Sequence, residues 1–379
     1  MLAALSGGVD SAVAAARAAE AGHQVVGVHM ALMRNRSQTR QGSRGCCSIE
    51  DASDARRAAE QLGLDFYVWD LSEEFEDLVV QDFLQSYAAG RTPNPCVRCN
   101  EFIKFQVLLE RGLALGFDAI TTGHYARVKT TAQGGVSLRR GRDLAKDQSY
   151  VLAVAGPQAL RHCLFPLGEA RSKDEVRLEA AQRGLPVAEK PDSYDICFVA
   201  DGDTQGFLRS RLGERPGPVL DQDGVSVGTH TGAYQFTVGQ RRGLHLGRPA
   251  ADGAPRYVTG IDTASGVVRV GPVGLLRVDR FMTSQAVWLD PAAQAQVLAG
   301  EDLACLVQLR AHGTALPGRV RQVPGAEGPR QQVTLDQPMR GLAAGQAAVF
   351  YQGDRVLAAT TVEEVPTGTA TAVKITGQN

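Results

Sequence analysis

The sequence predicts an α/β protein with a doubly wound parallel sheet, followed by a small central domain and a C-terminal β-barrel. In the first half, apolar runs alternate with helical patterns. After about residue 206, short alternating runs separated by Gly-containing turns replace the long helical patterns. Strands that alternate with helices pair in parallel, whereas short, evenly spaced strands are typical of barrels. We therefore expect domains at 1–205, 206–275 and 276–379.

The elements of the first half follow in a regular order. Apolar, β-branched or aromatic runs predict strands at 2–5, 24–30, 66–69 and 118–122. Apolar residues at three- and four-residue spacing predict helices at 12–21, 51–62, 74–88 and 100–115. Ligands of such a sheet bind at the carboxyl ends of its strands. We therefore expect the loop at Ser6, the strand end at Met30 and the turn at Gly123 to share one edge.

The second half reads as short β-strands. Two runs at 257–261 and 267–270 flank a Ser-Gly turn and predict a hairpin. Further alternating runs predict barrel strands at 303–309, 332–335, 347–351 and 356–361.

The composition narrows the class of protein. The 379 residues are 44% apolar and 21% charged, as in ordinary globular chains. Apolar runs stay well short of the roughly 20 residues that cross a bilayer, so we expect no membrane partner. The seven cysteines, an odd number, argue against a secreted disulfide framework and favour a cytoplasmic protein. The net charge of −1 restricts any RNA contact to local basic patches.

The residues after the first strand carry the strongest functional signal. Positions 6–11 read S-G-G-V-D-S and lead into an Ala-rich helix. The glycines let backbone N–H groups converge, and the helix N-terminus adds a positive dipole end, so the segment predicts a phosphate-binding loop. The Lys of a Walker A motif is missing, and Asp10 with two serines indicates Mg²⁺ and a released pyrophosphate. A tight turn without a ligand is the alternative.

The cysteines differ in the strength of their signals. Residues 91–100 read R-T-P-N-P-C-V-R-C-N and end where a predicted helix begins. A helix N-terminus and a neighbouring Arg stabilise a thiolate, which makes Cys99 a candidate nucleophile; half of a structural zinc site is the alternative. Cys197 is either an inert buried residue or part of a loop near the chemistry. We expect Cys163 and Cys305 to be packing residues, and the pair at 46–47 receives no role.

Basic residues precede the segment 146–149, which reads K-D-Q-S. Arg139, Arg140 and Arg142 lie just before it. Such a cluster suits an RNA backbone, and a solvated, charged hairpin is the equally good alternative.

Several motifs, in a fixed order, resemble those of the tRNA-specific 2-thiouridylase family. They are S-G-G-V-D-S at 6–11, V-H-M at 28–30, N-P-C-V-R-C-N-E-F-I-K-F at 94–105, T-G-H-Y-A-R at 122–127, K-D-Q-S-Y at 146–150 and D-I-C-F at 195–198. The glycine loop resembles that of the PP-loop ATP pyrophosphatase superfamily, whose fold is adenine nucleotide hydrolase-like. The likeness continues through T-G-A at 231–233 and V-G-Q-R at 238–241 into the final β domain.

The resemblance implies a role for each group of residues. ATP would bind at Ala4, Leu5, Ser6, Gly7, Gly8, Val9, Asp10, Ser11, Met30 and Gly123. The target uracil would lie against Asn94, Pro95 and Cys96. The tRNA would also contact Lys146, Asp147, Gln148, Arg310 and Ala311. Cys99 would be the catalytic nucleophile and Cys197 the persulfide carrier.

The implied reaction is ATP-dependent sulfur transfer to carbon 2 of the wobble uridine in a tRNA anticodon loop. Adenylation turns the 2-carbonyl oxygen into a good leaving group and releases pyrophosphate, which Mg²⁺ would assist. Sulfur from a Cys197 persulfide then attacks carbon 2, and Cys99 closes a disulfide with Cys197. A cysteine desulfurase or a sulfur relay protein would load the persulfide.

Two positions depart from the family pattern. Cys96 stands where many relatives have Asp, so a [4Fe–4S] cluster held by Cys96, Cys99 and Cys197 is an additional hypothesis. Ala311 replaces a frequent aromatic residue, which weakens that expected RNA contact. The alternatives are a pyrophosphatase-loop ligase, which would leave Cys99 and Cys197 idle, and a non-catalytic RNA- or metal-binding adaptor, against which the intact ATP loop counts.

Overall fold

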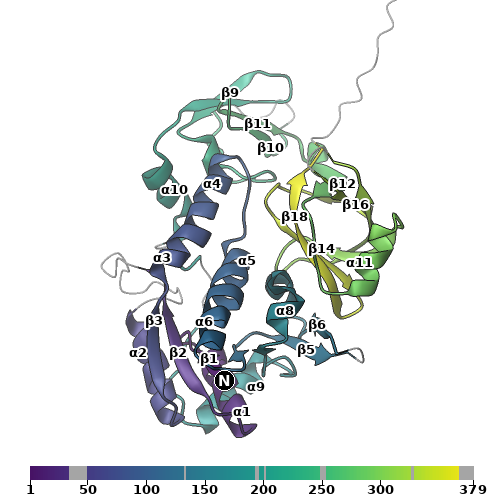
Figure 1. The fold of residues 1–379 in the computed structure, drawn as a ribbon. Helices are drawn as coiled ribbons and strands as arrows, with labels where there is room; N and C mark the ends of the chain where they lie inside the picture. The colour runs from purple at the N-terminus through teal and green to yellow at the C-terminus, as the bar shows by residue number, and fades with distance from the viewer. Residues whose placement is uncertain are drawn as a thin grey trace, which may run out of the picture.

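The computed structural model describes residues 1–33, 49–131, 134–192, 196–199, 202–247, 253–325 and 328–366. Cys46 and Cys47 lie outside these ranges. The described chain forms a parallel sheet, a smaller central sheet and a barrel, which occupy the lower left, the top and the right of Figure 1. Within the same ranges, no helix combines the length and the apolar character that crossing a membrane requires.

The N-terminal sheet is parallel and doubly wound, as predicted. Its strand order is β3-β2-β1-β4-β7, and each neighbouring pair runs in parallel. The strands are β1 (Leu2–Ala4), β2 (Val26–Ala31), β3 (Phe66–Asp70), β4 (Ile120–Thr121) and β7 (Cys163–Leu164). Because β2 and β4 lie on opposite sides of β1, the switch point of the sheet falls between β1 and β4. Ligands of such sheets bind in the crevice outside this point.

Helices connect these strands and follow them. They are α1 (Val9–Glu20), α2 (Ile49–Gln61), α3 (Ser72–Phe75), η2 (Glu76–Val80), α4 (Gln81–Ala88), α5 (Pro95–Arg98), η3 (Cys99–Leu108), α6 (Leu109–Ala114), α7 (Ser149–Leu152), η4 (Ala153–Ala155), α8 (Gly156–Leu160), α9 (Lys173–Gln182) and α10 (Thr204–Leu212). The helices predicted at 74–88 and 100–115 are each continuous runs with a π-helical middle, η2 and η3.

The second of these runs begins five residues earlier than predicted, and its cap explains the difference. The Asn94 side chain accepts hydrogen bonds from the backbone N–H groups of Cys96 and Val97 at 3.1 and 3.2 Å. Pro95 follows at the first helical position, where its missing N–H costs nothing. The helix therefore starts at Pro95, and Cys99 lies beyond its first turn.

The central sheet has the strand order β10-β11-β8-β9. Its strands are β8 (Gly217–Leu220), β9 (Ser226–His230), β10 (Tyr257–Asp262) and β11 (Val267–Gly271), with the short helices η6 (Ala233–Gln235) and η7 (Val273–Leu276) beside them. The predicted hairpin is confirmed, because β10 and β11 pair antiparallel.

The C-terminal barrel closes through six antiparallel strands. They are β12 (Arg277–Thr283), β14 (Leu303–Gln308), β15 (Leu316–Val323), β16 (Arg330–Arg340), β17 (Ala347–Gln352) and β18 (Arg355–Glu364). The order β12-β16-β15-β14-β17-β18 returns to β12, so the ring is complete. Strand β13 (Val287–Trp288) pairs with β18, and α11 (Pro291–Leu298) covers the barrel (Figure 1). The predicted barrel strands at 303–309, 332–335, 347–351 and 356–361 all lie in this ring.

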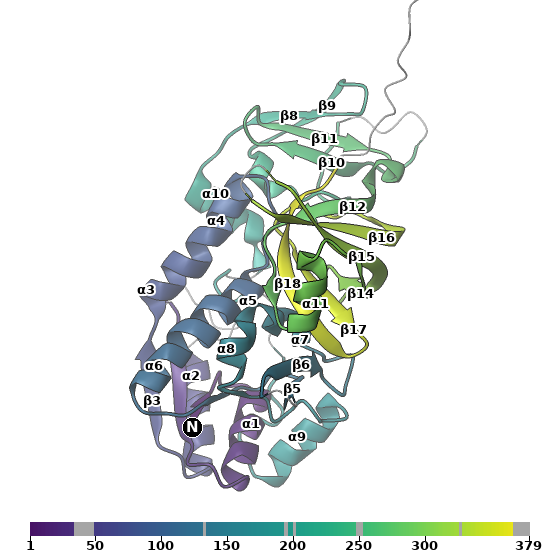
Figure 2. The ribbon, with the colours of Figure 1, turned by 45° about the vertical axis from the view of Figure 1, so that its right-hand side comes forward.

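A hairpin from the first half fastens the barrel to the parallel-sheet domain. Strands β5 (Ala126–Thr130) and β6 (Val136–Arg140) pair with each other, and β6 pairs with β18 through Arg139 and Arg355. Arg127 and Arg139 bind Asp354 at 2.8 and 2.7 Å. Figure 2 shows this hairpin below the barrel strands. Arg139 and Arg140 of the basic stretch therefore lie in a hairpin, Arg142 and the segment 146–149 follow it, and the charge of Arg139 is paired within the protein.

Candidate functional site

The glycine loop connects β1 to α1 and is held in one shape by its own serine. Gly7 has a φ of 77°, and a Cβ at this position would lie 2.2 Å from the backbone oxygen of Asp51. Ser11 Oγ accepts a hydrogen bond from the Ser6 backbone N–H at 3.1 Å and donates to the Gly8 carbonyl at 2.9 Å. The N-terminus of α1 therefore opens onto a fixed loop, the arrangement that binds phosphate.

The three predicted edge positions do lie together. A Cβ on Gly123 would approach the backbone of Asp10 and Ser11 to 2.6 Å, so the turn after β4 packs directly on the loop. Met30 lies at the end of β2, which runs parallel to β1 in the register Ala4 to Val28. The loop, the Met30 strand end and the Gly123 turn thus surround the switch point of the sheet.

An ionic network surrounds the loop, and the sequence does not predict most of its contacts. Asp10 accepts hydrogen bonds from the Tyr125 hydroxyl at 2.7 Å and from Lys173 Nζ at 2.6 Å. Lys173 Nζ also lies 3.1 Å from Asp192, which binds Lys146 and Arg177 as well. Burial opposes ionisation of Asp192, but its hydrogen bonds to Lys173 and Lys146 dominate and lower its pKa. In the sequence, Lys173 begins an ordinary polar helix, which gives no signal of this role.

Lys190, a second lysine whose role the sequence does not predict, also supports the loop. Lys190 Nζ donates to the Gly7 carbonyl at 2.9 Å, to Asp51 at 2.7 Å and to Asp54 at 2.5 Å. Burial opposes the charge on Lys190, but these hydrogen bonds outweigh it and raise its pKa. Lys190 therefore ties the loop backbone to the start of α2.

The segment 146–148 faces this network. Lys146 donates to Asp192 at 3.1 Å, and Gln148 Oε1 accepts from the Tyr125 backbone N–H at 3.0 Å. The Asp147 side chain is only 3% exposed, because its carboxylate accepts from Arg140 and from the turn around Ser149. The structure thus gives Asp147 a structural role, and tRNA contact by this segment stays a prediction.

Two cysteines from distant parts of the chain pack against one hydrophobic cluster. Cys99 and Cys197, both partly buried, contact the cluster that contains Phe75, Phe83 and Phe198. The rings of Phe198 and Phe83 are 5.2 Å apart, which fixes the residue next to Cys197 on this core. The fold therefore packs both predicted thiols against the same hydrophobic cluster.

The surroundings of Cys99 differ from the prediction in two respects. The helix begins at Pro95, so Cys99 lies outside the first turn, where the dipole acts most strongly. The Arg98 guanidinium binds Asp82 at 3.3 Å and Glu101 at 2.9 Å, which offsets its charge. The exposed Cys96 occupies the first turn instead.

The structure agrees with the predicted packing roles of Cys163 and Cys305, but it does not support the predicted metal sites. Burial raises the pKa of the Cys163 thiol, and it raises that of Cys305 to about 12, in agreement with packing roles. Among the described residues, no group of three or more His, Cys, Asp or Glu side chains is arranged to hold a metal ion. The structure therefore gives no support to an iron–sulfur cluster on Cys96, Cys99 and Cys197, or to a zinc site.

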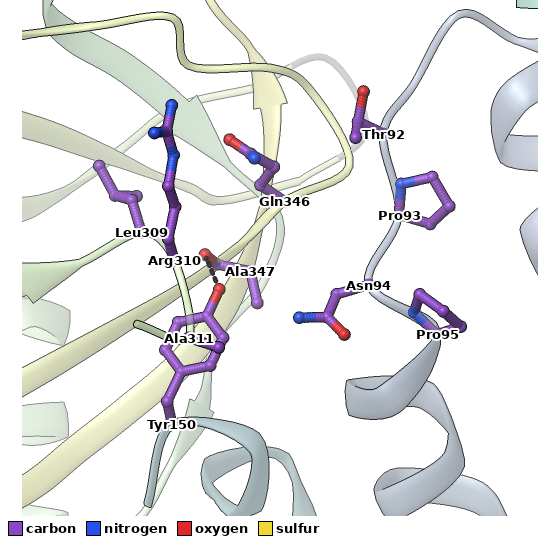
Figure 3. A pocket seen from close by; sticks show the side chains of 10 residues that line it. All are labelled: Thr92, Pro93, Asn94, Pro95, Tyr150, Leu309, Arg310, Ala311, Gln346 and Ala347. Carbon is purple, nitrogen blue, oxygen red and sulfur yellow. Dashed lines mark hydrogen bonds between the residues drawn. The ribbon is translucent and has the colours of Figure 1, made fainter. Parts of the chain in front are cut away.

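A cavity of about 180 Å³ lies between the parallel-sheet domain and the barrel. Figure 3 shows Asn94 and Pro95 on one wall and Arg310 and Ala311 on the other. The remaining lining residues are Thr92, Pro93, Tyr150, Leu309, Gln346 and Ala347. Tyr150 donates to the Ala347 carbonyl at 2.8 Å, which joins the two domains at the cavity floor. Two groups of predicted RNA-contacting residues therefore meet at one place, although Cys96 is not in its lining.

The Arg310 side of the cavity is built by hydrogen bonds within the barrel. Arg310 donates to the Gly341 carbonyl at 2.8 Å while the residue stays exposed. Gln308 Nε2 donates to the carbonyls of Arg310 and Ala311 at 3.0 and 3.1 Å. The loop that carries Arg310 is thus held in place at the domain interface.

Comparisons with known proteins identify the family of the chain. Residues 1–201 match a family described as the tRNA methyl transferase HUP domain, residues 205–272 its PRC-barrel domain, and residues 278–362 an aminomethyltransferase beta-barrel domain. The chain is 66% identical to the tRNA-specific 2-thiouridylase of Beutenbergia cavernae, over 96% of this chain and 94% of the relative. It is 53% identical to the protein of the same name from Renibacterium salmoninarum, over 99% of each. Because this identity extends along nearly the whole chain, the chain belongs to the tRNA-specific 2-thiouridylase family.

Proposed function

We propose that this protein is a tRNA-uridine 2-sulfurtransferase that uses ATP to place sulfur on carbon 2 of the wobble uridine in an anticodon loop. The main observation in support is that Cys99 and Cys197 pack against one hydrophobic cluster. Met30, at the sheet edge where we expect ATP, packs against the same cluster. This shared packing supports the proposal that ATP and the two thiols lie close together within one domain. We also propose the division 1–205, 206–275 and 276–379; each part contains one of the three sheets, and the β5–β6 hairpin of the first part joins the barrel sheet.

In the first step, the 2-carbonyl oxygen of uracil attacks the α-phosphorus of ATP, and pyrophosphate leaves. Backbone N–H groups of residues 7–11 hold the phosphates at the N-terminus of α1. The carboxylate of Asp10 and the hydroxyl of Ser6 are oxygen donors of the type that Mg²⁺ prefers. When bound there, Mg²⁺ would neutralise charge on the phosphates.

In the second step, the outer sulfur of a Cys197 persulfide attacks carbon 2, the bond from carbon 2 to the former carbonyl oxygen breaks, and AMP leaves with that oxygen. The Cys99 thiolate then attacks the Cys197 sulfur, which breaks the bond to the transferred sulfur and leaves 2-thiouridine. A Cys99–Cys197 disulfide forms, and a thiol reductant must reopen it. A cysteine desulfurase or a sulfur relay protein would load the persulfide before each turnover.

The cavity between the domains is a suitable place to hold the unstacked base. Its volume of about 180 Å³ is similar to that of a cavity of roughly 150 Å³ that binds benzene, so a pyrimidine ring would fit. The cavity lies where the helix that carries Cys99 begins, because Asn94 and Pro95 are its cap and first residue. Arg310 on the opposite wall would contact the RNA backbone.

The test is mass analysis of tRNA nucleosides after incubation with ATP, Mg²⁺ and a persulfide donor. We expect 2-thiouridine with the unaltered protein and none with Cys99→Ala or Cys197→Ser. Cys305→Ser is the matched control, because this thiol lies in barrel strand β14 and should be dispensable. If Cys197→Ser still produced 2-thiouridine, the persulfide proposal would be wrong.

A further inference from the structure

We propose that Lys173 is a phosphate-binding residue that contacts the β- and γ-phosphates of ATP and stabilises the departing pyrophosphate. This inference deepens the proposed function and rests on its first step. Lys173 reaches the glycine loop from α9, more than 160 residues along the chain from Asp10. It would supply the ammonium group that the loop itself lacks.

The loop needs a cation from elsewhere. The only charged residue within 6–11 is the acidic Asp10. A helix N-terminus provides the equivalent of only about half a positive charge, whereas a triphosphate brings several negative ones. A fixed cation beside the loop therefore contributes strongly to binding and to the stabilisation of charge that develops as pyrophosphate leaves.

The packing of α9 on α1 fixes Lys173 at the loop. Val176 and Ala180 of α9 share a buried cluster with Ala12 and Val13 of α1. Arg17 and Glu179 form an ion pair between the same two helices. The Lys173 side chain is 12% exposed and its Nζ lies 5.9 Å from the centre of the Tyr125 ring. Lys173 thus begins a helix whose position is set by the helix that the loop opens.

The hydrogen bonds of Lys173 leave capacity for a ligand, and those of Lys190 do not. Lys190 donates to three acceptors, which uses all the N–H groups of an ammonium. Within the described part of the chain, Lys173 has two acceptors, Asp10 and Asp192. One N–H of Lys173 is therefore available at the loop, and Lys190 is a structural support.

Lys173 can also exchange a partner without leaving a buried charge alone. Asp192 is bound by Lys146 and Arg177 in addition to Lys173. If Lys173 turns from Asp192 to a phosphate oxygen, two cations stay with that carboxylate. Among the described residues, Asp192 is thus shared by Lys173, Lys146 and Arg177, and Asp10 is bound by Lys173.

The experiment compares binding of α,β-methylene ATP and of AMP by calorimetry, without tRNA, for Lys173→Met, Lys173→Arg and the unaltered protein. A hydrogen bond to a charged group of this kind changes affinity by about 10- to 100-fold. We expect Lys173→Met to lose affinity for the triphosphate by this factor and to keep its affinity for AMP, and Lys173→Arg to recover most of the loss. Lys129→Met, at an exposed position on β5, is the control.

The outcomes separate this inference from the function on which it rests. Equal affinities of Lys173→Met and the unaltered protein for the triphosphate would overturn the inference, and so would a parallel loss for AMP, which indicates a collapsed loop. Thermal unfolding of each variant checks that it is folded. If the unaltered protein bound no triphosphate and formed no 2-thiouridine, the proposed function itself would fail.

Discussion

Gly123 offers a direct test of how the phosphate loop is shaped. A Cβ on Gly123 would lie 2.6 Å from both the backbone carbon of Asp10 and the backbone nitrogen of Ser11. Both atoms belong to the backbone, so no side chain can rotate away. The substitution Gly123→Ala must therefore push the turn and the loop apart by several tenths of an ångström.

The magnitude of this effect follows from the overlap. Overpacking of a well-packed region costs about 1–3 kcal/mol in the free energy of unfolding. Misplacement of a reacting group by about 1 Å can lower a rate by about 10²-fold. Because the Gly123 overlap is smaller than this, we expect pyrophosphate release to fall by about 10-fold or more, with weaker binding of α,β-methylene ATP.

The assay measures uridine-dependent pyrophosphate release, nucleotide affinity and thermal unfolding for Gly123→Ala. Gly274→Ala is the matched control, because a Cβ on Gly274 would meet no atom within 4 Å. We expect the control to behave as the unaltered protein. If Gly123→Ala kept full nucleotide affinity and full pyrophosphate release, the turn after β4 would not support the loop as we argue.

Two further predictions concern the cap at the cavity and the turn beside Gly123. Asn94→Ala removes the acceptor for Cys96 and Val97 and should lower stability by about 1 kcal/mol; Asn94→Asp keeps the cap, so thiolation lost with unchanged stability would separate base contact from capping. Burial, with Lys104 nearby, lowers the pKa of His124 well below 6.5. As the pH falls, the imidazole of His124 is therefore protonated in the unfolded chain before it is protonated in the folded protein. The contribution of neutral His124 to stability is full above about pH 6.5 and is lost as the pH falls below it. Between about pH 7.5 and about pH 5, the unfolding temperature of His124→Asn should fall less than that of the unaltered protein; equal slopes would contradict this assignment.

Part of the site could be predicted because its signals are local. The strand, glycine turn and helix around residues 6–11 follow one another directly, and each depends on its own residues and near neighbours. The carboxyl ends of parallel strands must meet at one edge, so the contact of Gly123 with the loop could also be expected. The helix starts at Pro95 and not at residue 100, because the cap that Asn94 provides sets its start and the apolar spacing does not reveal this cap.

The sequence by itself therefore determined the class of fold and the glycine turn between β1 and α1, and it predicted the two cysteines of the proposed chemistry. Only the tertiary structure decided which charges surround the loop, because Lys173 and Lys190 lie in polar segments without a local signal. It also decided that Asp147 is turned inward and that Arg310 faces Asn94 across a cavity. The physical reason is that the local sequence around a charged residue on a surface helix or hairpin is the same whether its side chain is solvated or pairs with a distant residue. Packing of α9 on α1 and of β6 on β18 makes that choice.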